Sequence, residues 1–203
     1  MTLAATDQRE RLRRRSKLLV WATIVWNGLE GIVAIAAGAV AGSAALIGFG
    51  LDSTVEVSAA VVALWYLAGD DDERGRRASR LIAVSFFALA TYVSFDALRD
   101  LGAGADPDTS IAGIVITALS ALVMPWLASA KRRAGQALGS KALVAESAET
   151  ALCAYLSIAV LAGLVLDAVL GWGWADPVAA LGVAALAVRE GREAWRHGLE
   201  DCC

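Results

Sequence analysis

The chain has 203 residues, 58% of them hydrophobic, and a mean hydropathy of +0.58. Ordinary soluble domains are about 45–50% apolar, so this composition excludes a typical soluble domain and favours a membrane protein. The formal net charge is only −3, because the charged residues lie mostly between apolar runs, and no nucleic-acid partner is expected. Three cysteines, two of them at the C-terminus, provide no disulfide framework.

Six stretches of the chain are long and apolar enough to cross a bilayer as helices, which takes about 20 residues. They are residues 18–40, 43–68, 79–101, 110–130, 141–170 and 175–195. A signal peptide is the rival interpretation of the first stretch, but the apolar part of such a peptide has only about 7–15 residues. The first stretch also contains Trp26, Asn27 and Glu30. We therefore predict an all-α polytopic membrane protein with six transmembrane helices.

Lysine and arginine are concentrated in alternate connections between these stretches. They precede the first stretch, follow the second, fourth and sixth, and leave only Arg99 on the opposite side. The positive-inside rule then places both termini in the cytoplasm, and we expect the inner or plasma membrane. The predicted organisation is a basic cytoplasmic segment (1–17), a six-helix transmembrane domain (18–195) and a short cytoplasmic tail (196–203).

Acidic residues occur inside two of the apolar stretches, where each charge costs about 2.5–3.5 kcal/mol on insertion scales. Asp52 and Glu56 lie four residues apart in the second stretch, and Glu149 and Cys153 are spaced in the same way in the fifth. Because residues i and i+4 share a helix face, each pair presents two ligand atoms on one stripe. No lysine or arginine is expected at the same depth to pair with Asp52 and Glu56. The pattern predicts a buried ion site.

An internal repeat relates these two stretches. GSAALIGFGLDSTVE (residues 42–56) aligns with GSKALVAESAETALC (residues 139–153). The alignment pairs Asp52 with Glu149 and Glu56 with Cys153, on helices expected to run in opposite directions. Inverted repeats commonly place a substrate site at the midplane of the membrane. Three carboxylates and one thiolate would suit a tetrahedral transition metal such as zinc better than Mg²⁺, which prefers octahedral oxygen sites.

The same four groups suggest coupling to protons. Clustered carboxylates in a medium of low dielectric constant favour their protonated form. A bound divalent cation favours the opposite state and expels the protons. Metal and protons would then compete for one site, as an antiporter requires.

The chain resembles the cation diffusion facilitator, or cation efflux, family. The resemblance rests on Asn27, on the two aligned segments and on ADPVAALGVAALAV at residues 175–188. It implies a six-span metal/proton antiporter that works as a homodimer. By position, the family's metal ligands correspond to Asp52, Glu56, Glu149 and Cys153. Glu149 and Cys153 stand where the family usually has a His/Asp pair in span five. We expect a short branch of the family that lacks the usual cytoplasmic domain after span six.

We therefore expect a divalent transition-metal cation/proton antiporter that exports its substrate from the cytoplasm. Zinc is the first expected metal, with cobalt, cadmium, iron and manganese as further candidates. We expect no organic cofactor and no enzyme, because no H-E-x-x-H motif is present and no histidine lies in a span. Two alternatives stay open. One is a proton-coupled exporter of small organic cations that binds them through Glu30, Trp21 and Trp26, and the other is a membrane protein that senses or buffers metal without transporting it.

Several other residues have more than one interpretation. Glu146, one turn before Glu149, is a candidate for metal access or a second proton site, and Glu30 for a proton relay or a packed acid. The tail contains the only histidine and two cysteines, His197, Cys202 and Cys203, which would either collect metal or have no role. Small residues would allow a homodimer to assemble through the spans. They include Gly31, Ala34, Gly38, Gly113 and Gly182.

Overall fold

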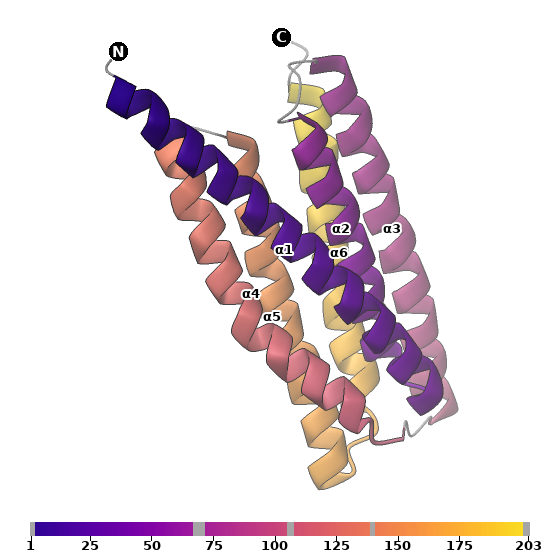
Figure 1. Cartoon of the computed structure of the whole chain (residues 1–203). Helices are drawn as coiled ribbons and strands as arrows, with labels where there is room; N and C mark the ends of the chain where they lie inside the picture. Colours follow the sequence, from indigo (N-terminus) through magenta and orange to yellow (C-terminus); the bar gives the residue numbers. More distant parts are fainter. Residues whose placement is uncertain (1–2, 67–71, 105–107, 139–140, 201–203) are drawn as a thin grey trace.

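The computed structural model describes residues 3–66, 72–104, 108–138 and 141–200, which form six long helices and no strand (Figure 1). The helices are α1 (Leu3–Ala41), α2 (Ala44–Tyr66), α3 (Asp72–Ala103), α4 (Ile111–Leu138), α5 (Lys141–Leu170) and α6 (Ala175–Glu200). Each of them contains most of one predicted apolar stretch. The prediction of an all-α chain with six helices is confirmed.

Basic residues that we predicted in connections lie instead inside helices. The fourth apolar stretch was expected to end at residue 130, but α4 continues to Leu138 and includes Lys131, Arg132 and Arg133. The basic segment before the first stretch likewise continues α1, which begins at Leu3. Lys131 was expected in the connection between the fourth and fifth stretches, but it lies within α4 and is fully buried. That expectation is wrong, because the helix continues past the end of its apolar run.

The outer surface of the bundle is apolar, as a membrane requires. Large hydrophobic side chains with at least 70% of their surface exposed include Ile32, Phe95, Ile111, Leu122 and Val169. Soluble proteins rarely expose large contiguous apolar areas. Within the described part of the chain, four helical segments are long and apolar enough to cross a membrane: Glu10–Ala41, Ala44–Val61, Ile111–Leu138 and Glu149–Leu170. For α3 and α6, which carry more charged residues, spanning stays a prediction.

Successive helices alternate in direction, so α1 begins and α6 ends at the same end of the bundle (Figure 1). Arginines near the start of α1 and the ends of α4 and α6 lie at this end, whereas Arg99, near the end of α3, lies at the other. The two helices related by the sequence repeat, α2 and α5, are antiparallel, as the inverted repeat predicts. They pack against each other and both pack against α6.

Polar contacts at the start of α2 fix this helix against α6. Gly42, with a φ of 69°, makes the sharp turn out of α1 that a residue with a Cβ would resist. Ser43 then caps α2, because its hydroxyl accepts a hydrogen bond from the Leu46 N–H at 3.1 Å. The same hydroxyl donates to Asp176 of α6 at 2.5 Å, and the other Asp176 oxygen accepts from the Ala45 N–H at 3.3 Å.

Most of the small residues that we considered for a dimer contact instead pack against other helices of the same chain. A Cβ added to Gly31 would lie 3.1 Å from the carbonyl oxygen of Gly50, and one added to Gly38 would meet Ile47. A Cβ added to Gly113 would likewise meet a leucine of α2, and Ala34 is fully buried. These residues therefore bring α1 and α4 close to α2. Gly182, by contrast, faces open space within the described structure.

Candidate metal site

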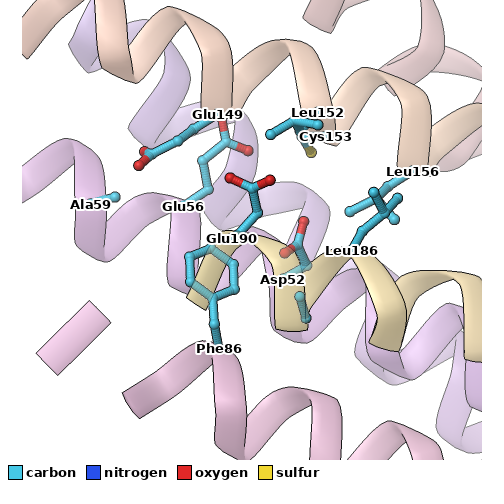
Figure 2. A pocket seen from close by; sticks show the side chains of 11 residues that line it. Asp52, Glu56, Ala59, Phe86, Glu149, Leu152, Cys153, Leu156, Leu186 and Glu190 are labelled. Carbon is cyan, nitrogen blue, oxygen red and sulfur yellow. The ribbon is translucent and has the colours of Figure 1, made fainter. Parts of the chain in front are cut away.

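One pocket brings together all four residues predicted as metal ligands (Figure 2). Its volume is about 400 Å³, including space open to the surroundings. Asp52 and Glu56 come from α2, Glu149 and Cys153 from α5, and a further acid, Glu190, comes from α6. The rest of the lining is apolar: Ala59, Phe86, Leu152, Leu156, Leu186 and Ala187. The helical spacing that predicted two facing pairs is therefore consistent with the folded chain.

The α2 pair is buried although both residues are acids. Asp52 is 8% exposed and Glu56 is 6% exposed. Neither carboxylate oxygen of Glu56 has a hydrogen-bond partner among the described residues. Buried polar groups in proteins are nearly always hydrogen-bonded, and an exception needs an explanation. A pocket that receives protons or a cation would provide one, because either would satisfy the carboxylate.

The α5 pair contributes an acid and a thiol to the same pocket. Cys153 is a free cysteine and is only 2% exposed. Glu149, one turn earlier, is half-buried. Within the described residues, however, no three His, Cys, Asp or Glu side chains lie close enough to hold one metal ion together. Neighbouring carboxylates repel one another, and a divalent cation would have to draw them closer.

Glu190 was not predicted as a site residue. It lines the pocket from α6, and its Oε1 atom is buried without a partner in the described part of the chain. Its neighbours Arg189 and Arg192 led us to assign this segment to the basic cytoplasmic end of the last span. The sequence signal that could have identified Glu190 is helical spacing. Ala187, which also lines the pocket, lies three residues before Glu190 and shares its helix face.

Glu146 lies outside the pocket lining and is held by a basic partner. The Nζ atom of Lys131 donates to Oε1 of Glu146 at 3.0 Å and to the Thr150 hydroxyl at 2.9 Å. The two charged side chains are 0% and 3% exposed. The pair joins α4 to α5 one turn from Glu149. This arrangement supports a structural role for Glu146 rather than the access or proton site that we considered.

The remaining sequence candidates lie elsewhere. Glu30 is fully buried on α1 outside this pocket, beside Trp26, whereas Trp21 is 55% exposed on the outer surface. The three residues predicted for a common organic-cation site therefore do not share one buried space. The His197 side chain and residues Cys202 and Cys203 of the predicted metal-collecting tail lie outside the described part of the structure.

Comparisons with known proteins agree with this architecture. Residues 78–201 match the family model described as the cation efflux transmembrane domain. The chain is also 29% identical over 177 residues to a protein of Synechocystis sp. named uncharacterized transporter sll1263. That match covers 82% of this chain and 56% of the relative, so the chain spans about half the length of the curated relative it matches. The α5 pair lies inside the range of the family match, and the α2 pair precedes it.

Proposed function

Because the chain belongs to the cation efflux family, we propose that it carries a divalent transition-metal cation out of the cytoplasm in exchange for protons. The observation that carries this proposal is the pocket in which α2 and α5 each present an acid-containing i, i+4 pair. Buried acids inside a membrane are costly and usually mark ion pathways. The role is that of a transporter rather than an enzyme.

Proton exchange follows from the chemistry of this pocket. Carboxylates that gather in a pocket of low dielectric constant are stabilised either by protons or by a cation. A metal ion that binds several of them at once displaces the protons they held. Asp52, Glu56, Glu149 and Glu190 therefore give one site two mutually exclusive states. Competition between the two states is sufficient to couple metal movement to a proton gradient.

Zinc is the first substrate that we propose, with cobalt, cadmium, iron and manganese next. Cys153 supplies a soft sulfur donor beside hard carboxylate oxygens, and zinc accepts both kinds of ligand. A site with oxygen ligands alone would favour Mn²⁺ or Mg²⁺.

The proposed orientation places both termini in the cytoplasm of a cell whose inner or plasma membrane holds the protein. It is supported by the arginines gathered at the end of the bundle where α1 begins and α6 ends (Figure 1). Cytoplasmic connections carry an excess of Lys and Arg. In this orientation α2 runs toward the cytoplasm and α5 away from it, so the two ligand pairs approach the pocket from opposite sides of the membrane.

Family membership also supports a homodimer, although the small residues on α1 do not. Gly31, Ala34 and Gly38 are used within the protomer, so the proposed contact lies on another surface. Mass measurement in mild detergent should give two chains per particle. A fully active particle that contains one chain would contradict the proposed dimer.

The function is tested by metal flux into vesicles that contain the purified protein. With an imposed proton gradient, zinc should accumulate against its own gradient, and a protonophore should abolish the accumulation. Saturable zinc binding without flux would instead favour the sensor or buffer alternative. Flux of an organic cation but of no metal would favour the organic-cation exporter.

A further inference from the structure

The outer face of α1 changes from apolar to basic along one line of exposed residues, which we call the α1 stripe. Its members follow one another at intervals of three or four residues and therefore share a helix face. They are Arg14, Leu18, Trp21, Val25 and Leu29. Trp21 is 55% exposed, and Lys17 is exposed beside Arg14. Along this face an apolar part is followed by a tryptophan and then by positive charge.

The outer face of α4 has the same order of residues. The α4 stripe consists of Val115, Leu119, Leu122, Trp126 and Arg133, all exposed. Trp126, 65% exposed, lies seven residues before Arg133, just as Trp21 lies seven residues after Arg14. Because α1 and α4 run in opposite directions, both stripes become basic toward the same end of the bundle (Figure 1).

The spacing within each stripe fits the layers of a bilayer. Seven helical residues span about 10 Å at 1.5 Å per residue. Tryptophan side chains gather at the boundary between the apolar layer and the headgroups. The headgroup regions add about 10–15 Å in total to an apolar core of about 30 Å. With Trp21 and Trp126 at the boundary, Arg14 and Arg133 are therefore within reach of the lipid phosphates.

The basic residues are held at this height and their charges are available. Ser16, between Arg14 and Lys17 in the sequence, is 2% exposed, so α1 is still packed against the bundle at this level. Neither these two residues nor Arg133 forms an ion pair or side-chain hydrogen bond with another residue of the described ranges. An anionic ligand would supply the missing partner.

The two stripes together select the class of ligand. Arginine binds phosphate oxygens through charge-assisted hydrogen bonds, and the apolar part of each stripe requires a hydrocarbon neighbour. A phospholipid with a net negative charge offers both, whereas the headgroup of a zwitterionic lipid carries a cation of its own. We propose that the α1 and α4 stripes form a binding surface for anionic phospholipid in the leaflet at this end of the bundle. In the proposed orientation this is the cytoplasmic leaflet, which attracts basic segments beside transmembrane helices when it is anionic. The inference goes beyond metal/proton exchange and holds whichever ion is carried.

Helix α6 provides an internal control. Arg192 is also exposed near the end of the bundle where α6 ends. On this helix, however, the exposed Trp195 follows the arginine instead of preceding it, so it lies on the wrong side of the charge for the same fit. A general excess of positive charge would involve Arg192 as much as Arg14 and Arg133, whereas a surface formed by the two stripes would not.

The test is a titration of the purified full chain in neutral detergent with phosphatidylglycerol or phosphatidylcholine of identical acyl chains, measured by native mass spectrometry. Wild type should bind phosphatidylglycerol more tightly. Arg14→Gln and Arg133→Gln should each lower that affinity by about fivefold, the size typical of losing one basic residue near an anionic membrane surface. Neither variant should change the affinity for phosphatidylcholine. Arg192→Gln, which removes the same charge at the same end, should bind both lipids as wild type does.

Three results would overturn the inference. They are equal affinity of wild type for the two lipids, an effect of Arg192→Gln as large as that of Arg14→Gln and Arg133→Gln, and displacement of bound phosphatidylglycerol by soluble polyglutamate at equal total charge. The last result would assign the surface to an acidic protein instead. Should one of the two stripe variants fail to fold, the other decides. Zinc transport does not enter this measurement, so failure of the lipid site and failure of the proposed function remain distinguishable.

Discussion

The ammonium group of Lys131 lies 3.0 Å from the Glu146 carboxylate, and both side chains are buried between α4 and α5. The Thr150 hydroxyl, 2.9 Å from the same Nζ atom, completes the contact. Glu146 therefore has a fixed partner, while Glu149, three residues later on α5, lines the candidate metal pocket. One helix thus carries a structural acid and a candidate ligand acid close together, and the ion pair fixes the part of α5 that presents Glu149.

Removing the basic partner should destabilise the bundle. In Lys131→Met, Glu146 would be left buried without its counter-charge, which typically costs about 3–5 kcal/mol. Denaturant unfolding in detergent should show a loss of this size. The double variant Lys131→Met/Glu146→Leu should recover most of it, because an apolar pair of similar volume is often neutral relative to a buried ion pair. A single variant as stable as wild type would show that the pair contributes nothing.

The helices could be predicted from the sequence, because runs of about 20 apolar residues have few alternatives. The meeting of the four candidate ligands in one pocket could be predicted as well, since i, i+4 spacing places Asp52 with Glu56 and Glu149 with Cys153 on one face. The burial of Lys131 could not. A lysine just past an apolar run is usually solvated, and only the packing of α4 on α5 gives this one a partner.

Two other features also depended on tertiary structure. Glu190 is flanked by arginines in the sequence, and only the rotation of α6 shows that it lines the pocket while Arg189 and Arg192 are exposed. Glu30 stands out in the sequence as an acid in an apolar helix. The Ser120 side chain of α4, which interacts with the Glu30 carboxylate, does not, because a single serine in an apolar helix is common. Their proximity follows from the contact between α1 and α4.

Cys153 should determine which metals the pocket prefers. In Cys153→Asp, an all-oxygen ligand set should shift selectivity from zinc and cadmium toward Mn²⁺ and Fe²⁺. In Cys153→Ser, zinc and cadmium binding should weaken more than manganese binding, because a hydroxyl is a poor replacement for a thiolate. Competition among these ions for uptake into vesicles measures the order. An identical order in wild type and both variants would show that Cys153 only packs.

Glu190 should contribute to metal binding without being essential. In Glu190→Gln, the pocket loses one of its negative charges but keeps both ligand pairs, so the apparent KM for zinc should rise by about tenfold while transport persists. Glu193→Gln is the matched control, since Glu193 is exposed on the same helix one turn later. Equal KM values for the two variants would remove Glu190 from the site.

Asp52 is a buried acid of α2 in the pocket that it shares with the α5 pair, and the proposed transport depends on it most directly. The decisive measurement is proton-driven zinc uptake into vesicles containing wild type, Asp52→Asn or Asp96→Asn at equal protein density. Asp96, the control, is an acid of α3 that does not line the pocket. We predict that Asp52→Asn folds and inserts normally but gives no more uptake than protein-free vesicles, while Asp96→Asn transports as wild type does. Uptake by Asp52→Asn equal to that of wild type would contradict the account.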